Sequence, residues 1–144
     1  MQEGIGYTLA LMKKPNPRHL TMVICDSVIE DKRTRKKSLI GIFNNITASS
    51  VPCVHPRLNV FVALTEGHGV YGMLMRCLKV GDESEIMKMD GNVTFKDPRQ
   101  IIEFNCEIVG LKFPDYGEYR FEVLFDGNPV VSRKFKVSPE GEGA

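Results

Sequence analysis

The sequence predicts an all-β fold, an immunoglobulin-like antiparallel β-sandwich of about 7–8 strands. Three observations support this class: short apolar runs recur with turn residues between them, no long helical pattern interrupts them, and Asp115, Gly117 and Tyr119 precede one of the last runs. That spacing is typical of a tyrosine corner, in which the ring packs inside while the hydroxyl bonds to upstream backbone. We therefore expect Tyr119 and Phe121 in the core.

The length of 144 residues suits a single domain with one core. Pro15-Asn16-Pro17 interrupts any regular element near the start. We expect an N-terminal arm that is either free or docked on the body, a β-sandwich domain and a flexible C-terminal tail. Their respective ranges are 1–18, 19–138 and 139–144.

Strand-like runs begin soon after this arm. The charged segment Glu30–Lys37 separates the first two runs, a loop with Pro52 and Pro56 separates the next two, and Glu66–Gly69 forms a tight connection to the fourth. The predicted strands are Leu20–Ile29, Ser38–Thr47, Leu58–Thr65, Val70–Val80, Glu85–Phe95, Gln100–Val109, Glu118–Phe125 and Val130–Val137.

Turn residues also separate the later runs, since Gly81-Asp82-Glu83 precedes the fifth and Asp97-Pro98 precedes the sixth. Within the sixth run, apolar and polar residues alternate from Ile102 to Ile108, as in a strand with one buried and one wet face. Regular spacing without intervening helices favours antiparallel pairing.

The last two runs predict a hairpin. If Asp126-Gly127-Asn128 is a three-residue loop, Phe125 faces Pro129 and Tyr119 faces Phe135, a favourable aromatic pair. The same register places Arg133 opposite Phe121 on the core side. A bulge or a position at the end of the sandwich would accommodate that arginine.

Charge and hydropathy limit the possible ligands and the cellular location of the protein. The 19 basic and 18 acidic residues give a net charge of +1, so no global field attracts the molecule to nucleic acid or to an anionic membrane. The apolar run Ile5–Met12 lacks a preceding basic residue and is too short to span a bilayer. We expect no secretory signal, no membrane span and a cytoplasmic location.

The cysteines are widely spaced and include no Cys-x-x-Cys pair; they are Cys25, Cys53, Cys77 and Cys106. In a chain of this length that pattern favours reduced, buried residues of a reducing compartment. A disulfide between two strands remains the alternative.

Several phrases together resemble a family of small bacterial proteins described only as a domain of unknown function. The resemblance covers residues 20–137 and implies a β-sandwich in a bacterial, cytoplasmic setting, but it implies no activity and no catalytic residues. The phrases are Val23-Ile24-Cys25-Asp26, Lys37–Ile46, His55-Pro56-Arg57-Leu58, Phe113–Tyr119 and the closing hairpin.

Candidate catalytic and metal-binding groups are sparse. Cys53 and His55 lie two residues apart and His68 follows on a later turn, but a zinc site needs three or four converging ligands. No nucleophile elbow, recognisable Cys and His spacing or phosphate-binding glycine loop is present. We expect no enzyme, no cofactor and no metal.

The alternative function is a calcium- or phosphate-dependent surface-binding sandwich. Calcium requires several carboxylates. The acidic loop residues that could supply them are Asp82, Glu83, Glu85, Asp90, Asp97, Asp115 and Asp126. Asp-Gly pairs among them are also explained by turn geometry alone.

A basic turn over residues 32–37 is the second candidate surface. Lys32, Arg33, Arg35, Lys36 and Lys37 place five positive charges in six residues. Such a tip suits phosphates or an acidic protein surface. It lacks interleaved aromatic residues, so stacking on single-stranded bases is unsupported. The alternative is a solvated turn that protects strand edges.

The main functional hypothesis concerns an outer sheet face. Several predicted strands are apolar on both sides, and Phe61, Met73 and Met75 would form an exposed patch there. Either a partner covers this patch or the protein covers it itself. We expect a non-enzymatic binding or assembly module with a protein partner or self-association, contacted through this face, with the basic turn as an auxiliary anchor.

Overall fold

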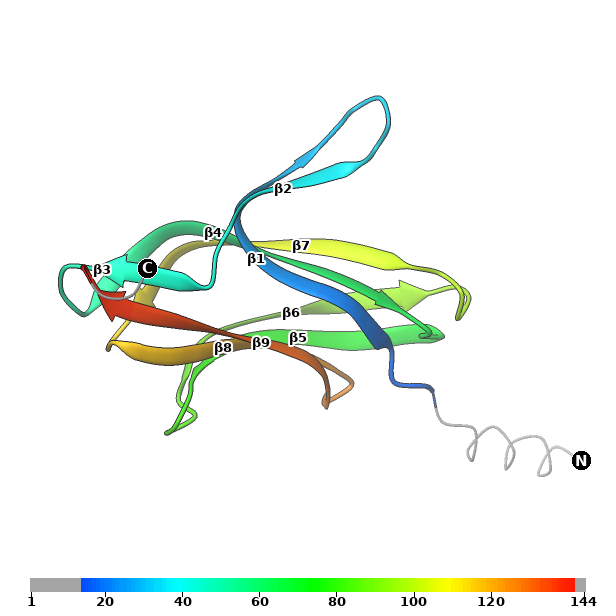
Figure 1. Cartoon of the computed structure of the whole chain (residues 1–144). Helices are drawn as coiled ribbons and strands as arrows, with labels where there is room; N and C mark the ends of the chain where they lie inside the picture. Colours follow the sequence, from blue (N-terminus) through cyan, green and yellow to red (C-terminus); the bar gives the residue numbers. More distant parts are fainter. Residues whose placement is uncertain (1–13, 142–144) are drawn as a thin grey trace, which may run out of the picture.

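A computed structural model describes residues 14–141, and these residues form two stacked β-sheets without any helix (Figure 1). The prediction of an all-β sandwich is confirmed. The strands are β1 (Arg18–Glu30), β2 (Lys37–Ile42), β3 (Asn45–Ala48), β4 (Cys53–Thr65), β5 (Gly69–Lys79), β6 (Glu85–Phe95), β7 (Ile102–Phe113), β8 (Gly117–Phe125) and β9 (Asn128–Pro139).

One sheet has the strand order β2-β1-β4-β7 and the other has the order β3-β9-β8-β5-β6. All neighbours are antiparallel except β3 and β9, which pair in parallel through Asn45 with Lys136 to Ala48 with Pro139. The predicted run Ser38–Thr47 is therefore two strands in different sheets. The chain crosses between the layers at Phe43 and Asn44, each of which takes part in a backbone hydrogen bond to a different layer.

The core lies between the sheets and is built by alternation along each strand. On β4, Leu58, Val60, Val62 and Leu64 point inward and have no exposed surface. Aromatic rings from the opposite layer meet them, and Phe121 stacks on Phe135 with centroids 5.1 Å apart. This packing explains why the predicted core residue Phe121 is fully buried.

Tyr119 forms the predicted tyrosine corner. Its ring is fully buried, and it packs edge-on against Phe113 at 5.0 Å and stacks on Phe135 at 5.9 Å. Its hydroxyl bonds to the backbone of Asp115. Gly117 has φ +135, a left-handed value that suits glycine. The buried ring and the bond from its hydroxyl to upstream backbone are those that the sequence predicted.

The closing hairpin is tighter than predicted. Asp126 and Gly127 have φ values of +51 and +82, so they form a two-residue turn in which Phe125 pairs with Asn128 rather than Pro129. A register shift between Val123 and Leu124 then restores the predicted register. The three-residue loop is therefore wrong, whereas the pairs Tyr119 with Phe135 and Phe121 with Arg133 are confirmed.

Arg133 shows how a charged residue is accommodated on the core side. It is half-buried, and its Nη1 donates a 3.1 Å hydrogen bond to the carbonyl oxygen of Met22 on β1. Since β9 and β1 belong to different sheets, this contact bridges the two layers.

The N-terminal boundary also differs from the prediction. Arg18 already begins β1, and the residues before it contact the sandwich. Lys14 Nζ lies 2.7 Å from Asp126 Oδ2 and 4.6 Å from the centre of the Tyr71 ring, while the Tyr71 hydroxyl donates to the Pro15 carbonyl at 2.7 Å. The rest of the predicted arm, residues 1–13, and residues 142–144 of the predicted tail lie outside the described residues.

Candidate partner-binding hairpin

The predicted apolar patch does not exist as one surface. Phe61 lies on β4 in one sheet, whereas Met73 and Met75 lie on β5 in the other. Met75 is fully buried in the core, Met73 packs against the core, and Phe61 is only 7% exposed. The prediction of an exposed face built from these residues is therefore wrong.

Phe61 is buried although it lies on the outward side of its sheet, beside Asn59 and Ala63. The hairpin formed by the end of β1 and β2, residues 26–42, is joined to this side. Lys37 Nζ lies 3.0 Å from Glu103 Oε1, and Glu103 is the β7 partner of Ala63. At the base of the hairpin, Asn59 Nδ2 donates to the Asp26 carbonyl at 2.8 Å. We refer to residues 26–42 as the β1–β2 hairpin.

The tip of the β1–β2 hairpin is a defined turn that projects from the body (Figure 1). The Asp31 carboxylate accepts hydrogen bonds from the backbone N–H groups of Arg33 at 2.7 Å and Thr34 at 3.0 Å. These bonds lower the Asp31 pKa. Arg35 has φ +64, and its N–H donates to the Asp31 carbonyl at 2.8 Å. The cations are therefore presented by an ordered loop.

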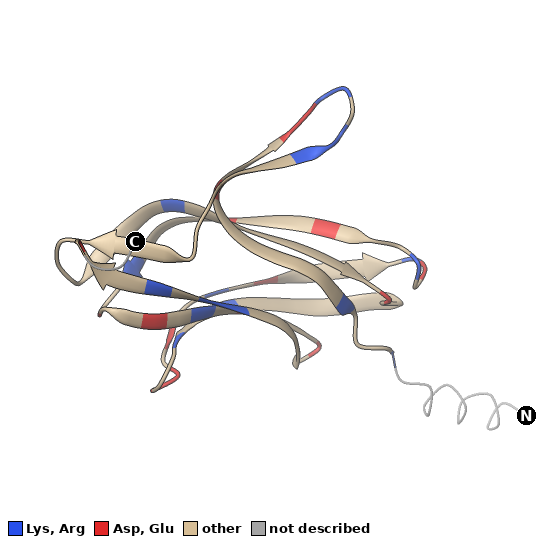
Figure 2. Cartoon of the chain, viewed as in Figure 1, with Lys and Arg blue, Asp and Glu red and all other residues tan. Residues whose placement is uncertain are grey.

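All of the predicted basic residues at this tip are exposed, and Figure 2 shows them as a blue group at the end of the hairpin. Arg35 pairs with Glu30 at 3.3 Å. Within residues 14–141, Lys32, Arg33 and Lys36 form no ion pair. The tip thus carries uncompensated positive charge.

One side of the β1–β2 hairpin is apolar and exposed. Alternation places Lys37 and Leu39 on the side that is joined to Glu103, and Ile29 and Ile40 on the opposite side. Ile29 and Ile40 are 50% and 46% exposed, and Ile42 near the base is 60% exposed. Strand β2 is also the end strand of its sheet. The hairpin therefore combines an apolar side, a sheet edge and a basic tip.

A pocket of about 350 Å³ lies at the base of the hairpin. We refer to it as the elbow pocket. It brings together segments far apart in the chain, and its lining residues are Asp26, Gly41, Ile42, Phe43, Asn45, Ile46, Thr47 and His55. Burial lowers the pKa of His55, and the nearby charge of Asp26 opposes that shift.

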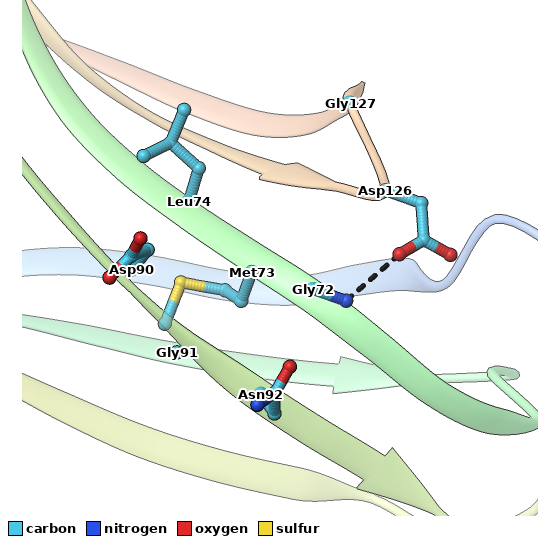
Figure 3. A pocket seen from close by; sticks show the side chains of 8 residues that line it. All are labelled: Gly72, Met73, Leu74, Asp90, Gly91, Asn92, Asp126 and Gly127. Carbon is cyan, nitrogen blue, oxygen red and sulfur yellow. Dashed lines mark hydrogen bonds between the residues drawn. The ribbon is translucent and has the colours of Figure 1, made fainter.

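The outer face of the other sheet carries a charge network. Glu122 is only 7% exposed and lies between Arg76 and Arg120, and Arg120 also pairs with Glu83. These ion pairs raise the pKa of Arg120 and lower that of Glu83. Nearer the end of the sheet, an open trough of about 560 Å³ is bordered by Asp90 and by Asp126, whose Oδ1 accepts from the Gly72 N–H at 2.8 Å (Figure 3).

Most of the predicted acidic loop residues have separate structural partners. Asp82 accepts from Ser84, Asp97 from Arg99, and Asp115 from Lys79. Among residues 14–141, no group of three or more His, Cys, Asp or Glu side chains is arranged to hold a metal ion. Cys53 begins β4 and His68 follows its far end, so these two candidate ligands are not brought together.

The four cysteines are free thiols, and the alternative of a disulfide between strands is not realised. Burial raises the pKa of Cys77 to about 12 and that of Cys106 to about 11. These values describe structural thiols, since the thiolate is the reactive form.

Sequence reasoning identified the basic tip but missed the apolar side of the hairpin and the elbow pocket. The apolar residues Leu39, Ile40 and Ile42 were a usable signal for the apolar side of the hairpin. They make both sides of this short strand apolar, and one side of a strand at the end of a sheet can remain exposed. No sequence signal indicated that Asp26 and His55 line the same pocket, since 28 intervening residues separate them.

The fold and surface define a two-layer β-sandwich protein with a projecting basic hairpin, and within the described residues it has no helix able to span a membrane. The chain belongs to the family described as "Family of unknown function (DUF6941)", whose model matches residues 20–138. This range covers all nine strands except the outermost residues of β1 and β9. A comparison with curated proteins finds no match.

Proposed function

We propose that the protein is a non-enzymatic binding module that contacts a partner protein through the β1–β2 hairpin. The observation that carries this proposal is the coincidence of an uncompensated basic tip with an exposed apolar side on one projecting element. Three cations, Lys32, Arg33 and Lys36, lack an acidic partner within the described chain. The isoleucines beside them are about half exposed.

The charge of the tip indicates the chemistry of the partner. A concentrated positive patch favours association with an acidic surface and accelerates encounter. The apolar side of the hairpin then supplies contact area, because burying exposed Ile40 and Ile42 is favourable. The tip segment from Asp31 to Lys37 contains no aromatic residue, so it lacks the stacking groups that single-stranded nucleic acid needs.

The proposal is tested by charge reversal at the tip. The variant Arg33→Glu/Lys36→Glu and a matched control, Lys112→Glu/Lys136→Glu, change the net charge equally; the control lysines are exposed on β7 and β9. Each tagged protein is used to capture partners from the native host at low and moderate salt. We expect a salt-sensitive partner that the wild type and the control retain and the tip variant loses.

A second variant, Ile40→Ser/Ile42→Ser, examines the apolar side separately. We expect it to weaken retention of the same partner without abolishing its salt dependence. Light scattering of the wild type distinguishes a foreign partner from a second copy of the chain. Identical capture by wild type, tip variant and control would overturn the proposal.

An anionic phosphate-bearing ligand is the second candidate for the same tip. It is favoured by the three cations alone and does not use the isoleucines. Retention of the wild type on a phosphate-bearing polyanion column, lost in the tip variant but unchanged by Ile40→Ser/Ile42→Ser, would favour this candidate.

We also propose an immunoglobulin-like topology and a bacterial, cytoplasmic setting. The tyrosine corner at the start of the penultimate strand supports the first of these. The four free thiols support a reducing compartment. Fractionation of the native host with antibody detection tests the location.

A further inference from the structure

The elbow pocket lies where the β1–β2 hairpin leaves the sandwich, and its walls come from four separate strands and the crossing between layers. Asp26 belongs to β1, Ile42 to β2, Thr47 to β3 and His55 to β4. The volume of about 350 Å³ lies at the small end of the range for ligand pockets. It suits one small molecule or one protruding side chain.

The charge of the pocket is negative. Asp26 is the only acidic residue in the lining, and the lining contains no lysine or arginine. Within residues 14–141, Asp26 takes part in no ion pair. Its carboxylate lies directly over Gly41, in space that a Cβ at that position would fill. An uncompensated carboxylate held over a glycine favours a positively charged ligand.

Aromatic surface lies beside this carboxylate. The rings of Phe43 and His55 have centroids 5.8 Å apart and an interplanar angle of 43°. Burial lowers the pKa of His55 and so favours its neutral imidazole beside Asp26. Aromatic rings attract organic cations, and a planar guanidinium both stacks on a ring and pairs with a carboxylate.

The remaining lining supplies apolar surface for a ligand stem. Ile46 is 6% exposed and Ile42 is 60% exposed, so one contributes buried surface and the other contributes surface near the solvent. The amide oxygen of Asn45 accepts a 2.8 Å hydrogen bond from Ser138 Oγ, which fixes the orientation of that side chain. The pocket thus offers one charged group, one aromatic pair and an apolar wall.

We propose that the elbow pocket binds an organic cation on an apolar stem, preferentially a guanidinium group, with Asp26 as counter-ion and Phe43 as the stacking surface. The ligand is either a free guanidinium compound or the side chain of an arginine on another protein. The basic tip contributes no residue to this pocket, and Ile42 is shared between the pocket and the apolar side of the hairpin. The proposal does not rest on the acidic partner proposed above.

The experiment follows backbone amide resonances of the full chain during titration with N-butylguanidinium. N-butylurea is the matched neutral probe, because it has nearly the same shape without the charge. We expect saturable shifts at Gly41, Phe43 and His55 with guanidinium, with an affinity on the order of millimolar as for small exposed sites. The urea should produce none that saturate.

Two variants locate the charge that is responsible. Asp26→Asn preserves the shape of the side chain, and the backbone carbonyl that accepts a hydrogen bond from Asn59 is unaffected. Because the negative charge is lost, this variant should bind the guanidinium about tenfold more weakly. Asp90→Asn removes an exposed carboxylate at the distant trough of Figure 3 and should leave binding unchanged. Equal shifts with the urea, equal binding by Asp26→Asn, or no saturable shift at the pocket would overturn the proposal.

The two ligand sources are separated by two further probes. N-acetyl-arginine amide represents an arginine within a protein, and free L-arginine represents a free amino acid. Tighter binding of the amide indicates a protein side chain as the ligand, and tighter binding of L-arginine indicates a small molecule.

Discussion

The hydroxyl of Tyr119 donates a 2.7 Å hydrogen bond to the carbonyl oxygen of Asp115, and the Tyr119 hydroxyl oxygen accepts a 3.3 Å hydrogen bond from the Asp115 N–H. A fully buried side chain thus satisfies both backbone groups of one residue at the entry to β8. Because the ring also contacts Phe113 and Phe135, the corner ties the loop between β7 and β8 to the core.

Replacing this hydroxyl should destabilise the fold. Tyr119→Phe keeps the ring in place but leaves the Asp115 groups without their partner, so we expect a loss of about 1–3 kcal/mol in the free energy of unfolding. Denaturant unfolding measures it. Tyr116→Phe is the matched control, since that hydroxyl bonds to the Ala48 carbonyl at 3.0 Å from a more exposed ring and should cost less. A Tyr119→Phe variant as stable as the wild type would contradict the role of the corner.

Any side chain at Gly41 should destabilise the fold. Its φ is +72, which costs other residues about 1–2 kcal/mol, and a Cβ there would overlap the Asp26 carboxylate. We expect Gly41→Ala to lower the unfolding free energy by more than the backbone cost alone. In an Asp26→Ala background the penalty should shrink toward that cost, because the carboxylate is gone. An equal penalty in both backgrounds would show that the overlap is unimportant.

The pKa of His55 should lie below the usual histidine value, because burial disfavours the imidazolium. In Asp26→Asn it should fall further, since the carboxylate favours the charged form. An NMR pH titration of the imidazole resonances measures both values. Because the unfolded chain then binds more protons, His55 reduces stability as the pH falls from the unfolded histidine pKa through the folded one. A higher pKa in the variant would contradict this assignment.

The thiols should react in an order set by their surroundings. At pH 8, a cysteine with a pKa of about 11 or 12 is almost entirely protonated, so Cys106 and Cys77 should resist iodoacetamide in the folded protein. Cys53, at the start of β4 and partly exposed, should be modified first. Mass spectrometry of digested samples follows each site, with urea-unfolded protein as the control in which all of them react. Modification of Cys77 as fast as Cys53 would contradict the burial argument.

Much of the fold could be predicted from local patterns. The tyrosine corner, the alternation along β7 and the bounds of β6 depend on nearest neighbours, and the structure reproduces them. The parallel pair of β3 with β9 was missed because Ser38–Thr47 appears as one continuous strand. The crossing at Phe43 and Asn44 divides this run, and the turn-favouring pair Asn44-Asn45 was the local signal that was not used.

The candidate site was predicted only in part. The basic tip could be predicted from a run of charged residues, because charged side chains in a turn are exposed whatever the rest of the fold. The prediction of an exposed apolar face was wrong because an alternating sequence pattern does not reveal what covers the outer side of a sheet. Phe61 was predicted to be exposed, yet it is only 7% exposed, and Lys37 of the hairpin pairs with Glu103 on β7 of the same sheet. Met75 was assigned to the wrong side of its strand.

The crossing at Phe43 and Asn44 has a mechanical consequence. Where the chain leaves the hairpin, the N–H of Phe43 donates a hydrogen bond to Ile24 of β1 in one layer. The carbonyl of Asn44 then accepts a hydrogen bond from Lys136 of β9 in the other layer. A force applied at the tip would therefore be transmitted to both sheets. The base of the hairpin is thus fixed to two layers, so pulling the hairpin away would require breaking a backbone hydrogen bond in each of them.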